Sequence, residues 1–108
     1  MVAGPYRSGS RDPAVWAANL RKLNEAAVAL WRAAHVPVIG VNMALPMIDA
    51  ADGTDQAYAE LMAPVSLALV ERCDACLWIG GPSRGADEEV RRFEAAGRPI
   101  YRSLDEIP

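Results

Sequence analysis

The chain has 108 residues, of which 52% are hydrophobic, and a formal net charge of −3 at pH 7. This length suits one domain with a modest core, and the negative charge argues against a nucleic-acid polymer as the main partner. No apolar run approaches the roughly 20 residues of a membrane span, and no basic region followed by an apolar stretch opens the chain. We therefore expect no membrane association, no signal peptide and a cytoplasmic location.

The first third of the chain predicts a strand, a loop and a long helix. Residues 1–4 look like the end of a strand, and residues 5–11 form a loop of small and polar residues. Asp12 is a good helix N-cap, and Pro13 suits the first helical position. Apolar residues then recur every three or four positions, which predicts an amphipathic helix that ends near His35.

The middle third predicts a strand, a long loop and a second helix. Residues 36–41 are rich in β-branched side chains and indicate a buried strand. Residues 42–54 are expected to form a loop, and residues 55–72 a helix that Pro64 kinks or interrupts. The loop's apolar centre, residues 43–48, is open to three interpretations: a nucleobase site, internal packing or an oligomer contact. We favour the oligomer contact, because this stretch is too apolar to remain exposed.

The last third predicts a strand at residues 73–79, a helix at 86–96 that Gly97 ends, a short strand at 98–101 and a helical turn at 103–107. Alternation of strands and helices predicts an α/β fold: a doubly wound parallel sheet of four to five strands in a single three-layer domain that spans residues 1–108. Ligands of such sheets bind at the carboxyl ends of the strands.

Residues 78–90 are the most informative stretch, because an apolar strand there leads through a glycine-rich loop into a helix. Free backbone N–H groups at a helix start suit an anion such as phosphate, and glycines allow close approach; here they are Gly80, Gly81 and Gly85. Three carboxylates follow: Asp87, Glu88 and Glu89. They can simply favour the helix dipole. Beside an anion site they also indicate a site that holds a phosphorylated ligand and acts on it chemically.

Cys73 and Cys76 form a single Cys-x-x-Cys pattern. It lies where a strand begins, whereas redox motifs of the thioredoxin type open a helix. The chain has one His, too few ligands for a zinc site with these two thiols. We therefore expect buried structural thiols and no metal, and keep redox or metal chemistry as a third, weaker hypothesis.

Four segments together resemble one known family. They are Ala-Gly-Pro-Tyr-Arg at 3–7, His-Val-Pro-Val at 35–38, Cys-Asp-Ala at 73–75 and Ser-Arg-Gly-Ala-x-x-Glu at 83–89. The set resembles the nucleoside 2-deoxyribosyltransferase-like superfamily, especially its small bacterial branch, over nearly the whole chain. That superfamily also contains 2′-deoxynucleoside 5′-monophosphate N-glycosidases. The resemblance implies a flavodoxin-like, Rossmann-like fold, a homodimer or larger homo-oligomer, a nucleoside or nucleotide as ligand, and no cofactor.

The resemblance also implies roles for particular residues. Glu89 matches the glutamate that attacks the anomeric carbon, and Ser83 and Gly85 match the family's phosphate-binding residues. A carboxylate there suits the oxocarbenium-like transition state of N-glycosidic cleavage. Further substrate-binding candidates are Gly4, Tyr6 and Arg7 after the first strand and Asn42 after the second.

One position departs from the family. Its active enzymes carry an aspartate before the third strand to protonate or orient the leaving base, and the matching residue here is Ser66. Two hypotheses therefore stand side by side. The first is an N-glycosidase or deoxyribosyltransferase-like enzyme, and the alternative is a module that binds a nucleotide or sugar phosphate without turning it over.

Overall fold

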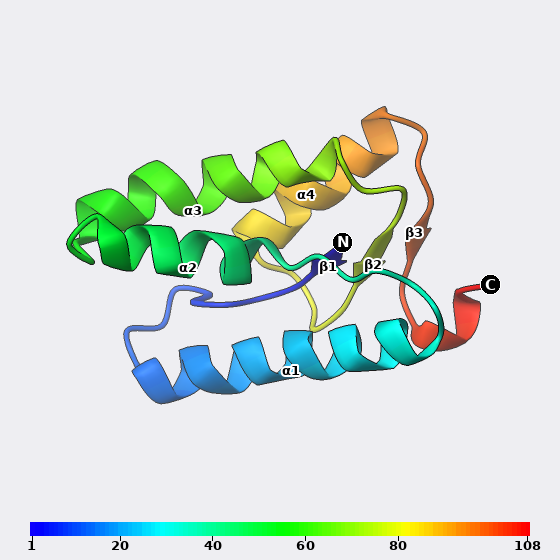
Figure 1. Ribbon diagram of the computed structural model, residues 1–108, viewed down its shortest axis with the longest axis horizontal. Coiled ribbons are helices and arrows are strands. Elements are labelled where there is room, and N and C mark those ends of the chain that lie inside the picture. The colour runs from blue at the N-terminus through cyan, green and yellow to red at the C-terminus, as the bar shows by residue number, and fades with distance from the viewer.

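The computed structural model describes residues 1–108 and contains a small parallel sheet with helices on both sides (Figure 1). In chain order the elements are β1 (Val2–Ala3), α1 (Pro13–Arg32), α2 (Gly40–Ala50), α3 (Asp55–Val70), β2 (Cys76–Trp78), α4 (Arg84–Ala95), β3 (Ile100–Tyr101) and the 3-10 turn η1 (Leu104–Glu106). The mixed α/β class is thus confirmed. No helix of this structure combines the length and the apolar character that crossing a membrane requires.

The sheet is smaller than predicted. It has three parallel strands in the order β1-β2-β3, with Val2 opposite Leu77 and Cys76 opposite Ile100. The prediction of four to five strands is therefore wrong. The doubly wound arrangement is wrong as well, because such a sheet grows to both sides of its first strand, whereas β2 and β3 are added on one side of β1 only.

The strand predicted at residues 36–41 does not form. What remains of it is one hydrogen bond, in which the Val2 amide donates to the Val38 carbonyl with an N···O distance of 2.8 Å. Pro37 has no N–H to donate, and α2 already begins at Gly40. The segment therefore runs beside the free edge of β1 without extending the sheet.

The loop predicted at residues 42–54 is also wrong, because residues 40–50 form helix α2 with Pro46 inside it. Ala44 and Ile48, four positions apart, are buried against Ala57 and Met62 of α3. Burial of this apolar stripe compensates for the hydrogen bond that Pro46 cannot make. Tertiary packing thus creates a helix that the local sequence does not favour.

The three other helices lie close to their predicted places. Asp12 caps α1 by accepting from the Ala14 amide (Oδ1···N 2.9 Å), and Pro13 is the first helical residue. Helix α3 begins at Asp55 as predicted and passes through Pro64 without interruption. Helix α4 begins two residues earlier than predicted and ends before Gly97, whose φ of 68° is the left-handed conformation that glycine accepts readily.

Two hydrophobic clusters fill the faces of the sheet. Alternation along the strands sends Val2 and Leu77 toward α1, where Leu23 and Leu30 complete the first cluster. Ala3 and Cys76 point the other way into the second cluster, which α3 and α4 complete with Val70, Val90 and Phe93. This burial fixes the positions of α3 and α4 relative to the carboxyl ends of β1 and β2, where the site described next is found.

Candidate active site

A cavity of about 800 Å³ opens at the carboxyl ends of β1 and β2. Its walls are the loop after β1, helix α3, and the loop and first turns of α4. Of the seven residues that the resemblance suggests for catalysis or substrate binding, all but Asn42 line it; these six are Gly4, Tyr6, Arg7, Ser83, Gly85 and Glu89. Segments far apart in the chain thus meet at the edge of the sheet where ligands of parallel sheets bind.

Asn42 lies outside the cavity lining. It is exposed in the first turn of α2, and its Nδ2 donates to Oδ1 of Asn24 on α1 over 2.7 Å. Because residues 40–50 are helical, Asn42 does not follow the end of a strand as predicted. Its contact links α1 to α2 and does not face the cavity.

Glu89 lies in the second turn of α4 and is largely buried at the cavity. Burial raises its pKa from 4.5 to about 7, while the Met1 ammonium and the Ser66 hydroxyl act in the opposite direction. Near neutral pH this carboxyl therefore exchanges between its protonated and ionised forms. Groups with such perturbed pKa values in a concave site are typical of catalytic positions.

Ser66 is buried on α3 and shares the cavity with Glu89. Its hydroxyl lies close enough to the Glu89 carboxyl to lower the pKa of that group as a hydrogen-bond donor. The residue at the position of the family's aspartate therefore faces the candidate catalytic carboxylate. It supplies a neutral hydroxyl there in place of a second carboxylate.

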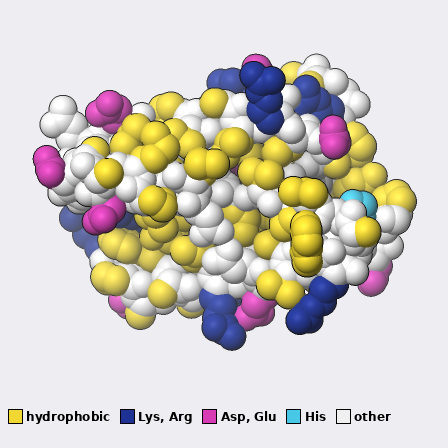
Figure 2. Space-filling view, in the orientation of Figure 1, with side chains coloured by type: hydrophobic (Ala, Val, Ile, Leu, Met, Phe, Trp, Pro, Cys, Tyr) yellow, Lys and Arg dark blue, Asp and Glu magenta, His cyan; other side chains and the backbone are white.

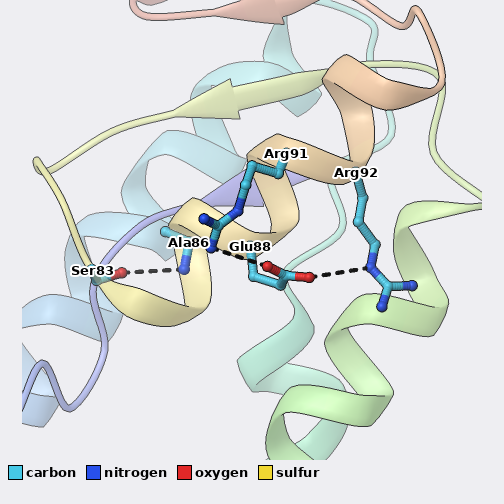
Figure 3. A network of polar contacts seen from close by, with 5 residues as sticks. All are labelled: Ser83, Ala86, Glu88, Arg91 and Arg92. Carbon is cyan, nitrogen blue, oxygen red and sulfur yellow. Dashed lines mark hydrogen bonds and ion pairs between the residues drawn. The ribbon is translucent and has the colours of Figure 1, made fainter.

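Glu88 and Asp87 differ from Glu89 in their surroundings. Glu88 lines the cavity but is paired, with Oε2 3.0 Å from Nη2 of Arg91 and Oε1 3.8 Å from Nε of Arg92 (Figure 3). Asp87 is absent from the cavity lining. Glu89 is therefore the one cavity carboxylate that makes no ion pair.

The loop before α4 provides donors for an anion. Gly80 and Gly81 have φ values of 79° and 82°, which turn the chain from β2 toward the helix. Ser83 caps α4, since its Oγ accepts from the Ala86 amide over 3.2 Å (Figure 3). The amides of Arg84 and Gly85 have no carbonyl partner within their own helix. A Cβ on Gly85 would meet nothing within 4 Å, so this part of the loop is open.

Gly4 has a structural reason to be glycine. A Cβ there would lie 2.8 Å from both the Ile79 carbonyl oxygen and Cδ2 of Leu23. Packing of the first loop against β2 and α1 thus accounts for this residue, whether or not it also borders a ligand.

Arg7 lies against two aromatic rings. Its Cζ lies 3.7 Å from the ring centroid of Tyr58 and 4.0 Å from that of Trp16. Tyr58, on α3, also lines the cavity and was missed by the sequence analysis. No motif or spacing identifies Tyr58, because only the packing of α3 across the cavity brings it to Arg7. We refer to Trp16, Arg7 and Tyr58 together as the Arg7 stack.

The two cysteines lie away from this cavity. Both are buried and unbonded to each other, and burial is the largest of the causes that raise the pKa of the Cys76 thiol to about 12. A thiol that stays protonated at neutral pH is a poor nucleophile and metal ligand. The structure contains no group of three or more His, Cys, Asp or Glu side chains placed to hold a metal ion.

Comparisons with known proteins add no relative: no family model matches the chain, and no curated protein or solved structure matches it.

Proposed function

We propose that this protein cleaves the N-glycosidic bond of a nucleoside or nucleotide, as a glycosidase or a deoxyribosyltransferase-like enzyme. One observation carries the proposal: Glu89 is an unpaired, largely buried carboxyl in a cavity that it shares with Ser83 and Gly85 at the start of α4. The resemblance to the nucleoside 2-deoxyribosyltransferase-like superfamily supports the same assignment for Glu89.

In the proposed reaction, the ionised Glu89 carboxylate approaches the anomeric carbon of the sugar as the bond to the base nitrogen breaks. The electron pair of that bond leaves with the base, which takes up a proton from water. Glu89 either forms a glycosyl ester or stabilises the oxocarbenium-like sugar electrostatically. Water then takes the sugar in a hydrolase, and a second base takes it in a transferase.

The remaining cavity residues would bind the substrate. Ser83, Gly85 and the first amides of α4 would hold a 5′-phosphate or 5′-hydroxyl group, since a helix N-terminus favours an anion. Tyr6 and Arg7 would flank the sugar, next to the group at its 5′ position. Neither a metal nor an organic cofactor enters this reaction.

The proposal includes a cytoplasmic location and a homodimer or larger assembly. Exposed apolar side chains support the assembly: Trp31 is 66% exposed on α1, and Met43 and Met47 are 51% and 42% exposed on α2. Figure 2 shows hydrophobic side chains at the surface over α2 and α3. A second copy of the chain is the partner that the resemblance implies for such a surface.

A second candidate function is binding without turnover. The observation that favours it is Ser66, a buried hydroxyl where the family's active enzymes carry an aspartate. A binding module would be stabilised by its ligand through mass action and would release no base.

The test incubates the protein with ribo- and deoxyribonucleosides and their 5′-monophosphates and follows free base by chromatography. Glu89→Gln should lower base release at least about 100-fold, whereas Glu88→Gln, its neighbour in the same cavity, should stay within about threefold. Base release that survives Glu89→Gln overturns the enzyme proposal. A ligand that raises the melting temperature without base release favours the binding module.

A further inference from the structure

The Arg7 guanidinium lies against two aromatic rings at once. Its Cζ is 3.7 Å from the ring centroid of Tyr58 and 4.0 Å from that of Trp16. Both contacts are short enough for cation–π attraction, which is stronger for a partly desolvated cation. The two rings therefore restrict the positions that the guanidinium can take.

The protein leaves this cation without an acceptor. Arg7 forms no ion pair, and its buried Nε has no hydrogen-bond partner. Arg91 and Arg92, by contrast, are both paired with Glu88. A half-buried guanidinium with unsatisfied donors is costly unless something else satisfies it. Because Arg7 lines the cavity, an anion bound there can supply the missing hydrogen-bond acceptor.

The loop that carries Arg7 is fixed from α1. Nε1 of Trp16 donates to the Ser10 carbonyl over 2.8 Å, and Nδ2 of Asn19 donates to the Tyr6 carbonyl over 2.7 Å. Trp16 thus holds both the loop and the guanidinium. The other ring, Tyr58, belongs to α3 and is the only contact of the stack from across the cavity.

We propose that Tyr58 is a positioning residue that, with Trp16, holds the Arg7 guanidinium in place for a phosphate monoester in the cavity and so selects nucleoside 5′-monophosphates over nucleosides. The inference rests on the proposed function for the nucleoside part of the ligand. An arginine fork fits phosphate oxygens through two parallel N–H···O bonds, which a lysine cannot reproduce. The ring of Tyr58 acts through Arg7, so its hydroxyl is dispensable.

Calorimetric binding in a Glu89→Gln background, which prevents turnover, tests the inference. The probes are 2′-deoxyribonucleoside 5′-monophosphates, the matching nucleosides and inorganic phosphate. Tyr58→Leu and Arg7→Lys should lower the affinity ratio of monophosphate to nucleoside by roughly 3- to 30-fold. Tyr58→Phe, which keeps the ring, should leave the ratio within about twofold.

A matched control exists outside the cavity. Arg102 is stacked on Trp78, with its Cζ 4.0 Å from the ring centroid, but does not line the cavity. Arg102→Lys should leave the ratio unchanged. If Tyr58→Leu does not fold, Tyr58→Met replaces it as the variant without the ring, and Arg7→Lys tests the guanidinium separately.

Four results would overturn the inference. The first is the absence of any preference for the monophosphate in the Glu89→Gln background, and the second is an unchanged affinity ratio in Arg7→Lys or Tyr58→Leu. The third is an equal loss of affinity ratio in Tyr58→Phe and Tyr58→Leu, and the fourth is inorganic phosphate that binds as tightly as the monophosphate. The proposed function can be refuted separately from this inference. Selection of the monophosphate through the Arg7 stack, with no release of base from any substrate, would refute only the proposal that the protein is an enzyme. Base release at equal rates from nucleosides and monophosphates, unaffected by Arg7→Lys, removes only this inference.

Discussion

The backbone of Gly40 on α2 packs directly on Ser66 of α3. A Cβ at Gly40 would collide with Oγ of Ser66 and would lie 2.7 Å from its Cβ and 3.0 Å from its Cα. Because Ser66 also faces Glu89, this close approach connects the start of α2 to the candidate catalytic carboxyl.

Gly40→Ala should therefore destabilise the protein by about 1–3 kcal/mol, since the added methyl group has no space between two packed helices. Gly85→Ala is the control, because a Cβ there meets nothing within 4 Å. Chemical unfolding would measure both free energies of unfolding. Equal stabilities of the two variants would contradict the close packing of α2 on α3.

How far the sequence predicts this structure depends on how local the signal is. Ser83, Gly85 and Glu89, which the sequence suggested as site residues, line one cavity because a single loop and helix start bring them together along the chain. Helix α2 was missed because Pro46 and the absence of a side-chain cap both argue against a helix in the local sequence. Its apolar stripe stabilises the helix only through packing against α3. Tyr58 was missed for the same reason: its partner Arg7 is distant in sequence and meets it only through tertiary packing.

The pH dependence of stability should report the burial of Glu89. Its pKa is about 7 in the folded protein and 4.5 when unperturbed, so the folded state binds more protons between these values. Stability from this group is present below pH 4.5 and is lost as pH rises toward 7. Glu89→Gln lacks this loss, so its stability relative to wild type should increase by on the order of 2–3 kcal/mol between pH 4.5 and 8.

Paired unfolding curves of the two proteins at several pH values would provide the measurement, and subtraction removes the contribution of all other groups. A difference that stays constant across this pH range would show that Glu89 titrates normally. Ser66→Ala provides a further check, because loss of its hydroxyl donor should raise the pKa of Glu89.

The thiols should be unreactive in the folded protein. Cys73 and Cys76 are 8% and 1% exposed, and the pKa of Cys76 is raised to about 12. Alkylation by iodoacetamide requires an accessible thiolate, so at pH 8 we expect neither residue to be modified until denaturant is added. Mass spectrometry of the treated protein would count the modified thiols. Rapid modification of the folded protein would revive the redox hypothesis.

Arg98 should contribute to stability at a point far from any proposed chemistry. Its Nη1 donates to the Val70 carbonyl over 2.7 Å and to the Cys73 carbonyl over 3.0 Å, and so connects the segment before β3 to the end of α3 and the turn that follows it. Arg98→Met keeps the aliphatic part of the side chain but removes both charged hydrogen bonds. We expect a loss of about 1–2 kcal/mol, less than for a fully buried pair because Arg98 is half-buried.

Arg21→Met is the matched control, since Arg21 and Glu25 form an exposed pair along α1 with an Nε···Oε1 distance of 2.9 Å. Exposed pairs of this kind contribute little, so this variant should stay within about 0.5 kcal/mol of wild type. A thermal or denaturant unfolding series would separate the two. If Arg98→Met lowered the free energy of unfolding no more than Arg21→Met does, the contacts of Arg98 with the end of α3 would not contribute to stability. Apolar packing alone would then hold the segment before β3 against α3.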